Sequence, residues 1–192
     1  MFQHSRFNNE ITFFQKIKNL DYVLVISVIL LSVISLFVMY STDGGEIRFH
    51  TKNHFVKLAV FFPLMIFVAF FNIKFWHNFS YIIYLIVILL LVWVSFFGIK
   101  SSGSQRWMDV YFFVLQPSEL MKVAIIMCLA KYFHRLKIEN VNSFTSIIIV
   151  LSVIVTPIIF VISQPDLGTS ILIALSGLII LWLGGVRIKY FI

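Results

Sequence analysis

Long apolar stretches separated by short polar segments run along the chain. The hydrocarbon core of a bilayer is about 30 Å thick, so a helix needs about 20 largely apolar residues to cross it. We therefore expect an all-α integral membrane protein, with a cytoplasmic segment at residues 1–20 and a polytopic transmembrane domain at residues 21–192. Six stretches approach the required length and are predicted to be spans, at residues 22–40, 55–71, 79–97, 117–133, 146–162 and 167–186.

The composition supports membrane integration independently of this pattern. Hydrophobic residues make up 60% of the 192 positions and charged residues 12%, whereas soluble domains contain about 45–50% apolar and about 25% charged residues. The net charge of +7 does not indicate nucleic-acid binding, because the basic residues are dispersed around the apolar stretches. The single cysteine, Cys128, is expected to be a buried or lipid-facing residue.

The distribution of lysine and arginine predicts the orientation of the chain. With the N-terminus inside, nine basic residues lie in the inside segments and five in the outside segments. The positive-inside rule then favours a cytoplasmic N-terminus. The first span is too long for a signal peptide and lacks a small-x-small cleavage site, so it is expected to be an uncleaved anchor.

Proline and glycine inside the spans predict where helices bend and approach one another. Pro63 lies in the second span and Pro157 in the fifth, and a neighbouring helix or water is expected to satisfy the carbonyl that each proline frees. A packing kink is favoured over a gating hinge, since proline is common in membrane helices. Close helix contacts are expected at the glycines of the sixth span, Gly168, Gly177, Gly184 and Gly185.

The richest polar cluster connects the third and fourth spans and continues into the fourth. Pro117 suits the first position of a helix, and Glu119 then lies in the first turn, where the helix dipole favours an anion. Lys122 is three residues further on and shares a face with Glu119. Two interpretations stay open. The pair is either structural, with the lysine extending to the interface, or it lines an outward-facing cavity for a charged head group.

Two further polar groups have both a structural and a functional interpretation. Arg106 precedes Trp107, and an interfacial anchor is favoured over a phosphate clamp. Gln164-Pro165-Asp166 forms a short turn before the sixth span, where Asp166 either caps the helix or borders a cavity.

Motifs for metals, cofactors and nucleophiles are weak. His50 and His54 have a helical metal-ligand spacing, but no third ligand is evident nearby, so no metal site is predicted. No phosphate-binding glycine loop, catalytic serine or cysteine arrangement, or pair of carboxylates set up for glycosyl chemistry is evident. No cofactor is evident either, and a requirement for a divalent cation stays open.

Two long stretches within the polar clusters carry a family resemblance. The first is Gly103-Ser104-Gln105-Arg106-Trp107-Met108-Asp109, followed by Phe113-Val114-Leu115-Gln116-Pro117-Ser118-Glu119. The second is Gln164-Pro165-Asp166-Leu167-Gly168-Thr169-Ser170-Ile171-Leu172, continuing through Ala174-Leu175-Ser176-Gly177-Leu178. In this order they resemble the two signatures of the SEDS family of shape, elongation, division and sporulation proteins. The residues of these two stretches are more similar to the elongation branch of the family than to its division branch.

The resemblance implies a fold and an activity. SEDS proteins are ten-span proteins of the bacterial cytoplasmic membrane that polymerise lipid II, the undecaprenyl-pyrophosphate-linked disaccharide-pentapeptide, into glycan strands. They work with a class B penicillin-binding protein, and the elongation branch acts in lateral wall growth, rod-shape maintenance and with other elongation-complex membrane proteins. The family's remaining spans, and the large external loop with its proposed catalytic aspartate, are expected beyond Ile192. No catalytic residue is therefore assigned within this chain.

The resemblance also suggests roles for the polar residues, which would together bind the substrate. Arg106 and Lys122 would contact phosphate, and Glu119 would orient Lys122. Asp166 would hold the cavity rim, and Gln164 belongs to the same predicted substrate-binding group.

Two alternatives from other functional classes are kept. A lipid-linked precursor flippase would also present an external polar cavity, although no internal symmetry of the kind common in transporters is evident. In the second alternative, this chain is a truncated or split product that only binds partners. In that case we expect poor stability, because its buried polar residues would lack the partners that the missing helices provide.

Overall fold

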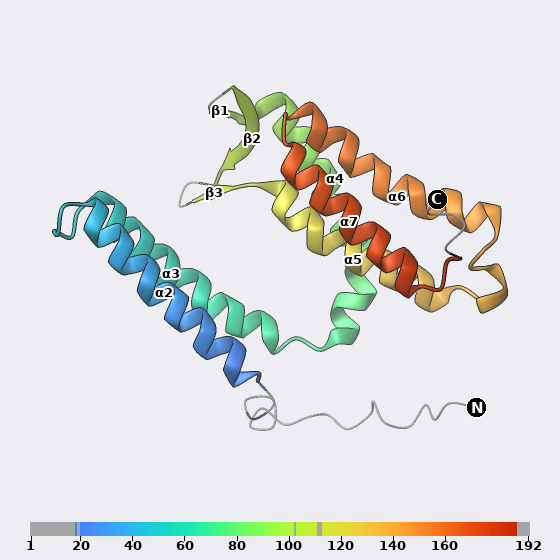
Figure 1. Cartoon of the computed structure of the whole chain (residues 1–192), viewed down its shortest axis with the longest axis horizontal. Coiled ribbons are helices and arrows are strands. Elements are labelled where there is room, and N and C mark those ends of the chain that lie inside the picture. The colour runs from blue at the N-terminus through green and yellow to red at the C-terminus, as the bar shows by residue number, and fades with distance from the viewer. Residues whose placement is uncertain (1–17, 19, 102, 111–112, 188–192) are drawn as a thin grey trace. The chain divides into compact units, whose positions relative to one another are not determined.

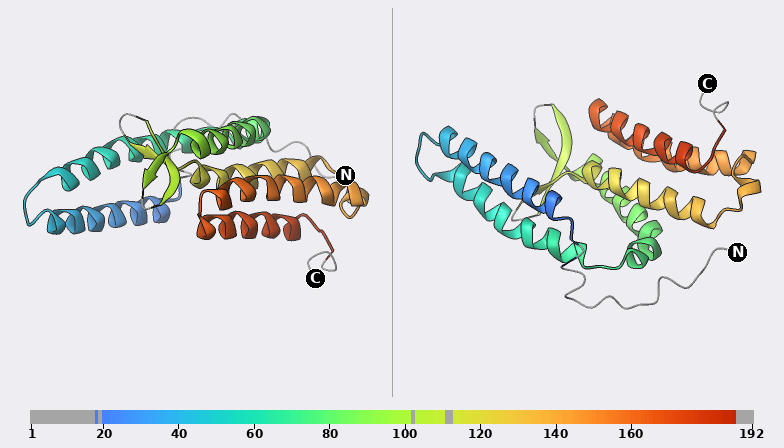
Figure 2. Two further views of the ribbon diagram at one scale, coloured as in Figure 1. Left: turned by 90° about the horizontal axis from the view of Figure 1, so that it is seen from above. Right: turned by 60° about the horizontal axis from the view of Figure 1, so that its bottom comes forward.

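The chain forms helices at all six predicted positions. The computed structural model describes residue 18 and residues 20–101, 103–110 and 113–187. The chain divides into two compact units, residues 1–72 and 73–192. Figures 1 and 2 show the helices of each unit from three directions. The expectation of an all-α membrane protein is confirmed, with the addition of a small sheet.

The first unit contains a hairpin of two helices, α2 (Tyr22–Thr42) and α3 (Phe49–Ala69). α2 begins after Asp21, whose carboxylate accepts a hydrogen bond from the backbone N–H of Leu24 at 3.1 Å, as an N-cap does. The two helices share a polar contact, because Oγ of Ser35 lies 2.7 Å from Nε2 of His54. Within lipid such an interhelical hydrogen bond contributes about 0.6 kcal/mol on average.

Asp43 joins the two ends of the turn in this hairpin. Its backbone N–H donates to the carbonyl of Met39 and closes α2, and its carboxylate accepts bonds from the N–H and the hydroxyl of Thr51, both at 2.7 Å. Arg48, the residue before α3, makes no side-chain cap, so Asp43 caps α3 from the turn. The backbone N–H of Thr51, and then its hydroxyl, hold the pKa of the Asp43 carboxyl below its usual value.

The described residues of the second unit form four long helices. They are α4 (Ile73–Phe97), α5 (Pro117–Arg135), α6 (Phe144–Ser163) and α7 (Leu167–Leu183), with a short 3-10 helix, η1 (Ile138–Asn140), between α5 and α6. α5 packs against both α4 and α7, and α7 packs against α6. The starts of α5 and α7 therefore lie at one end of this bundle, and their C-terminal ends lie at the other (Figure 1).

A three-stranded antiparallel sheet connects α4 to α5. β1 (Ile99–Ser101) pairs with β2 (Ser104–Asp109), and β2 pairs with β3 (Val114–Leu115). Gly103 lies between β1 and β2 with φ of +79°, a backbone conformation that favours glycine. The sequence predicts only a polar connection here, because β1 and β3 are too short for an alternating pattern and β2 does not alternate apolar with polar residues.

Several helix ends differ from the predicted span ends. α3 begins at Phe49 rather than near residue 55, and α4 begins at Ile73 rather than near residue 79. Hydropathy marks only the apolar part of a span, whereas the helix continues through the polar residues that precede it. α7 ends at Leu183 rather than residue 186, because Gly185 adopts φ of +87° and ends the helix.

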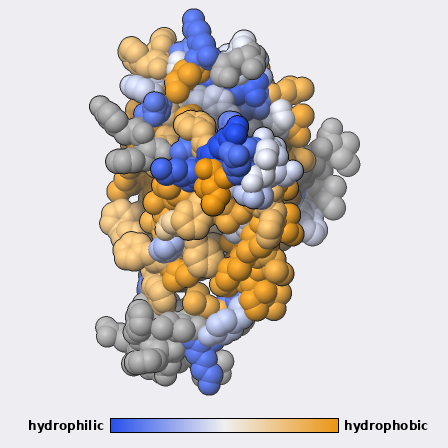
Figure 3. All heavy atoms as spheres, turned by 90° about the vertical axis from the view of Figure 1, so that its left-hand side faces the viewer, coloured by the Kyte–Doolittle hydropathy of each residue, from blue (hydrophilic) through white to orange (hydrophobic). Residues whose placement is uncertain are grey.

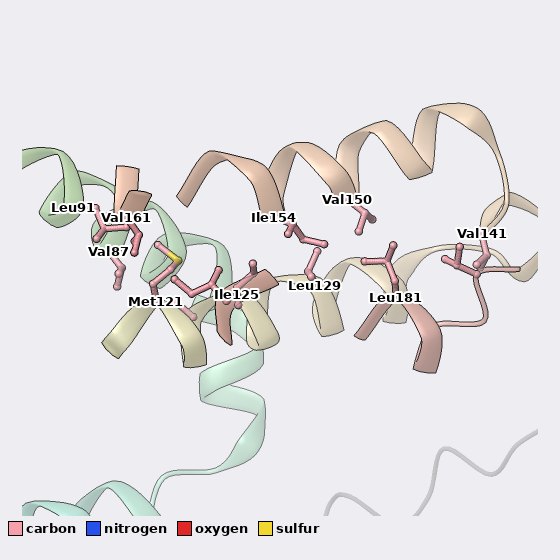
Figure 4. Close-up of a cluster of buried hydrophobic side chains, with 13 residues drawn as sticks. Val87, Leu91, Met121, Ile125, Leu129, Val141, Val150, Ile154, Val161 and Leu181 are labelled. Atoms are coloured by element: carbon pink, nitrogen blue, oxygen red, sulfur yellow. The ribbon is translucent and has the colours of Figure 1, made fainter. Parts of the chain in front are cut away.

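The apolar core of the second unit lies among α4, α5, α6 and α7. Figure 4 shows Leu91, Met121 and Ile125 in this cluster together with Ile154 from α6. Leu91, Met121 and Ile125 have no exposed surface. Cys128 is buried as well, in agreement with one of the two environments expected for it.

Most of the remaining helix surface is apolar and uncovered. α2 contains no buried residue, and hydrophobic residues cover much of the face shown in Figure 3. Contiguous apolar surface of this extent marks a membrane or interaction surface. Among the described helices, α2, α3, α4 and α6 are long and apolar enough to cross a membrane, and α7 is a shorter apolar helix of 17 residues. α5 coincides with the predicted fourth span and carries Glu119, Lys122 and Lys131.

Pro157 interrupts the hydrogen bonding of α6, and a neighbouring helix compensates. Proline has no N–H to donate to the carbonyl four residues earlier, which is that of Val153. The hydroxyl of Tyr84 in α4 donates to this carbonyl at 2.8 Å. The expectation that a neighbouring helix satisfies the freed carbonyl is confirmed for Pro157, and for Pro63 it stays a prediction.

Two glycines near and within α7 allow close contacts with neighbouring helices. A Cβ atom at Gly177 would lie 2.6 Å from Cγ1 of Ile154 in α6, and one at Gly184 would lie 2.9 Å from the ring of Phe133 in α5. The expectation of close contact is confirmed at these positions. It is wrong at the other two glycines of the predicted span, Gly168 and Gly185, which have open space around them because they are exposed at the two ends of the helix.

The contact between Tyr84 and Pro157 can be tested by unfolding experiments in detergent. Tyr84→Phe should lower the free energy of unfolding by about 0.6–1.7 kcal/mol, because it leaves the carbonyl of Val153 without a donor. In a Pro157→Ala background the restored N–H can reach that carbonyl, so the same substitution should cost less. An equal cost of Tyr84→Phe in both backgrounds would contradict this account.

The contact at Gly177 leads to a second prediction. Gly177→Ala should lower the free energy of unfolding by about 1–3 kcal/mol, because the added methyl group overpacks Ile154. Gly168→Ala is the matched control and should be neutral or stabilising by up to about 1 kcal/mol, because alanine is the better helix former and finds open space there. Thermal unfolding that ranks the two variants equally would refute the assigned contact.

Candidate functional site

The polar residues singled out in the sequence lie at the end of the second unit where α5 and α7 begin (Figure 1). Strand β2 carries Arg106, and the turn between α6 and α7 carries Gln164 and Asp166. The first two turns of α5 carry Glu119 and Lys122. The site therefore draws on a strand, a turn and a helix that are well separated in the sequence.

The carboxylate of Asp166 is the centre of a hydrogen-bond network. It accepts bonds from the N–H of Thr169 at 3.2 Å and from the Thr169 hydroxyl at 2.9 Å, which confirms that it caps α7. The amide of Gln116 also donates to it at 2.9 Å, and Nη1 of Arg106 lies 3.7 Å away. The Asp166 side chain is only 9% exposed, so these partners compensate the cost of burying its charge.

Arg106 clamps the turn before α7. Its Nε donates to the carbonyl of Gln164 at 3.1 Å, and its Nη2 donates to the carbonyl of Pro165 at 2.7 Å. The sequence suggests either an interfacial anchor or a phosphate clamp for Arg106, and neither interpretation predicts these two bonds to backbone carbonyls. The side chain remains 30% exposed, and a guanidinium has five N–H groups, so donors remain for a further anion.

Gln116 is a member of the network that sequence reasoning missed. Its Nε2 donates to Oδ2 of Asp166 and, at 3.0 Å, to the hydroxyl of Ser118. Gln116 is the residue immediately before α5, so it links the start of α5 to the start of α7. The sequence feature that could have identified Gln116 is the Gln-Pro pair, which precedes an acidic residue in both polar clusters.

Gln164 anchors the same turn to α4 and borders a cleft. It is 3% exposed, and its Nε2 donates to the carbonyl of Leu91 and to the hydroxyl of Ser95, both at 3.1 Å. The cleft has a volume of about 530 Å³ and is lined by Ser95, Lys100, Gly103, Ser104, Gln105, Ser163, Gln164 and Pro165. Of the five predicted site residues it includes Gln164. A cavity rimmed by the other four stays a prediction.

Glu119 and Lys122 form an ion pair one helical turn apart. Oε2 of Glu119 lies 2.8 Å from Nζ of Lys122, as the spacing predicts. Glu119 is 55% exposed and Lys122 is 26% exposed. In the part of the chain that the structure describes, no side-chain hydrogen bond or ion pair joins the Glu119 carboxylate or the Lys122 ammonium to the Asp166 network, and the link is the backbone bond from the N–H of Glu119 to the carbonyl of Gln116 at 3.1 Å. The two groups are thus neighbours along α5 rather than one connected cluster.

The arrangement suits the binding of an anion. The N-termini of α5 and α7 both lie here, and helix N-termini favour negative charge through their N–H groups and dipoles. Arg106 and Lys122 add two formal positive charges, which the carboxylates of Asp166 and Glu119 balance, and both cations remain partly exposed to a ligand. Among the described residues, no group of three or more His, Cys, Asp or Glu side chains is placed to hold a metal ion.

Fold and site together define a class, that of polytopic helical membrane proteins with a cluster of hydrogen-bonded polar residues at one end of the bundle. The family model described as cell cycle protein, which covers FtsW, RodA and SpoVE, matches residues 17–192. The chain belongs to this family, which is the SEDS family that its two motifs resemble.

Curated relatives agree with this assignment. The peptidoglycan glycosyltransferase MrdB of Escherichia coli K12 is 36% identical over 177 residues, which cover 92% of this chain and 47% of the relative. Stage V sporulation protein E of Bacillus subtilis is 31% identical over 182 residues, which cover 90% of this chain and 50% of the relative. The chain therefore spans about half the length of the curated relatives it matches.

Solved structures share the fold. The rod shape determining protein RodA of Thermus thermophilus aligns with a TM-score of 0.72 and 19% identity, over 86% of this chain and 54% of that chain. A chain from a structure of a peptidoglycan synthase complex aligns with a TM-score of 0.76 and 20% identity, over 87% of this chain and 48% of that chain.

The Asp166 network can be tested by a double-mutant cycle. Asp166→Asn should lower the free energy of unfolding by about 1–3 kcal/mol, because it weakens three hydrogen bonds and leaves Arg106 without its partner. Gln116→Ala should also destabilise, and the two effects should couple by about 0.5 kcal/mol or more, since the side chains touch. Asp109→Asn removes an exposed carboxylate at the end of β2 and is the control, with an expected change near zero. Strictly additive effects would argue against the network.

Proposed function

We propose that the whole protein is a peptidoglycan glycosyltransferase that polymerises lipid II into glycan strands during cell-wall elongation and rod-shape maintenance. The observation that carries the proposal is the pair of positioned, partly exposed cations Arg106 and Lys122 beside the N-termini of α5 and α7, in a chain of the SEDS family. Relatives named peptidoglycan glycosyltransferases support the same activity.

The chemistry of the substrate matches this site. A pyrophosphate carries several negative charges and needs donors that are held in place before it binds. Arg106 is held by two backbone carbonyls and Lys122 by Glu119, so both cations are positioned without substrate. In the proposal, Arg106 and Lys122 contact the phosphates while the polyprenyl chain stays in the surrounding lipid.

The other predicted site residues take supporting roles in this proposal. Glu119 orients Lys122. Asp166 and Gln164 hold the turn that Arg106 clamps, and the cleft beside Gln164 offers hydroxyl and amide groups suited to sugars and peptide. We assign no catalytic residue among residues 1–192.

The proposal includes a location and a partner. The N-terminus would lie in the cytoplasm, and the site would face outward from the bacterial cytoplasmic membrane. The end of the second unit opposite the site carries the excess of basic residues, which supports this orientation. A class B penicillin-binding protein is the proposed partner, supported by the fold shared with a chain of a peptidoglycan synthase complex.

The proposal is tested with the whole protein, its class B partner and purified lipid II. Lys122→Ala should lower the rate of glycan-strand formation by about 10- to 100-fold, which corresponds to a loss of about 1.4 to 2.7 kcal/mol of charge-assisted bonding. Arg106→Ala should lower it at least as far. Lys57→Ala, which removes an exposed lysine from α3, is the matched control and should leave the rate unchanged.

The readout also separates the alternatives. Glycan strands resolved on a gel demonstrate polymerisation, and a fluorescent lipid II that changes leaflet without being consumed would instead identify a flippase. Wild-type rates in a well-folded Lys122→Ala variant would rule out the proposed phosphate contact. Unchanged melting temperatures of the variants exclude a trivial loss of structure.

A further inference from the structure

The two ends of the second unit differ in charge. The end that holds the candidate site carries three basic and three acidic residues, namely Lys100, Arg106, Lys122, Asp109, Glu119 and Asp166. Among the described residues, the opposite end carries five basic residues and one acidic residue, namely Lys74, Lys131, Arg135, Lys137, Arg187 and Glu139. Both ion pairs found among the described residues of this unit lie at the first end.

Helix dipoles do not balance the excess of positive charge. A helix C-terminus provides about half a negative charge, and a helix N-terminus about half a positive charge. α5 and α7 end at the basic end of the bundle, but α4 and α6 begin there, so the four contributions cancel. The basic end therefore keeps a net formal charge of +4, which is five minus one.

One of these charges lies inside the bundle. Lys131 in α5 is only 4% exposed, and its Nζ donates to the backbone carbonyl of Asn78 in α4 at 2.6 Å. The same ammonium lies 4.6 Å from the ring centroid of Tyr81. In the described part of the chain no carboxylate pairs with Lys131, and a buried cation without a counter-ion favours an anion nearby.

Exposed donors lie beside this buried charge. His134 and Arg135 end α5, and Lys137 lies two residues after Arg135, all with exposed side chains. The ring of His134 meets the edge of His77 from α4 at a centroid distance of 5.2 Å. Nε2 of His77 is the one buried side-chain polar atom without a hydrogen-bond partner among the described residues, so this region contains an unmet polar group.

We propose that this basic end binds a phosphate group, and that the natural source is the head group of an anionic phospholipid. Arg135, His134 and Lys137 would contact the phosphate oxygens, and Lys131 would provide the charge behind them. A guanidinium suits the planar, two-point contact that phosphate accepts. Clusters of lysine and arginine next to membrane helices attract anionic head groups, and this cluster lies at the end of a membrane-spanning bundle. The site is separate from the one described above and does not depend on polymerase activity.

The test uses this chain reconstituted in nanodiscs. One preparation contains phosphatidylcholine alone, a second contains added phosphatidylglycerol, and a third contains phosphatidylcholine with inorganic phosphate in the buffer. Melting temperature is measured in all three, and native mass spectrometry counts the phosphatidylglycerol that the protein retains. We expect retained phosphatidylglycerol and a higher melting temperature in the second preparation.

Paired variants separate a site from general attraction to a charged surface. Arg135→Gln with Lys137→Gln should abolish both effects, whereas Lys52→Gln with Lys57→Gln in α3 removes the same charge and should preserve them. Equal losses in the two double variants, or no retained phosphatidylglycerol in the wild type, would overturn the proposal. A shift with inorganic phosphate that Arg135→Gln with Lys137→Gln removes supports the phosphate site and identifies free phosphate as a second ligand.

Discussion

Asp166 carries its charge in a nearly closed environment, and the candidate site is organised around that constraint. A buried carboxylate is tolerated only when donors surround it, and here they come from the first turn of α7, from the residue before α5 and from β2. Because each donor lies in a different segment, satisfying one carboxylate aligns a strand and the starts of two helices. Arg106 adds a second tie, since it bonds the backbone of the turn that carries Asp166.

The same principle extends through the second unit. In lipid no water is present to satisfy a free carbonyl, so another part of the protein has to donate to it. Tyr84, Gln164 and Lys131 each reach a backbone carbonyl of a different helix. These long polar side chains act as fixed contacts between helices whose remaining surfaces are apolar. They define which helix faces meet, which apolar packing alone specifies poorly because the surrounding lipid is equally apolar.

The polar groups of the bundle are divided between its two ends. One end holds balanced charge, two helix N-termini and a cleft, and the proposed function places the phosphates of lipid II there. The other end is strongly basic, and the further inference places the phosphate of an anionic lipid head group there. Under the two proposals, the first end binds the phosphates of a lipid-linked precursor and the second end binds the head groups of anionic lipids.

The sequence alone determined the helices, their order and the pairing of Glu119 with Lys122, because each depends on spacing along one helix. It also identified the family, since the two motifs are continuous in sequence. The carbonyls that Arg106 bonds lie 58 and 59 residues away along the chain, and the Asp166 carboxylate that Gln116 bonds lies 50 residues away. Only the tertiary structure decided these contacts and the positions of the short strands. Local periodicity shows which residues share a helix face, but it does not show which helix faces pack together. Hydrogen bonds between distant segments form only once those faces are in contact.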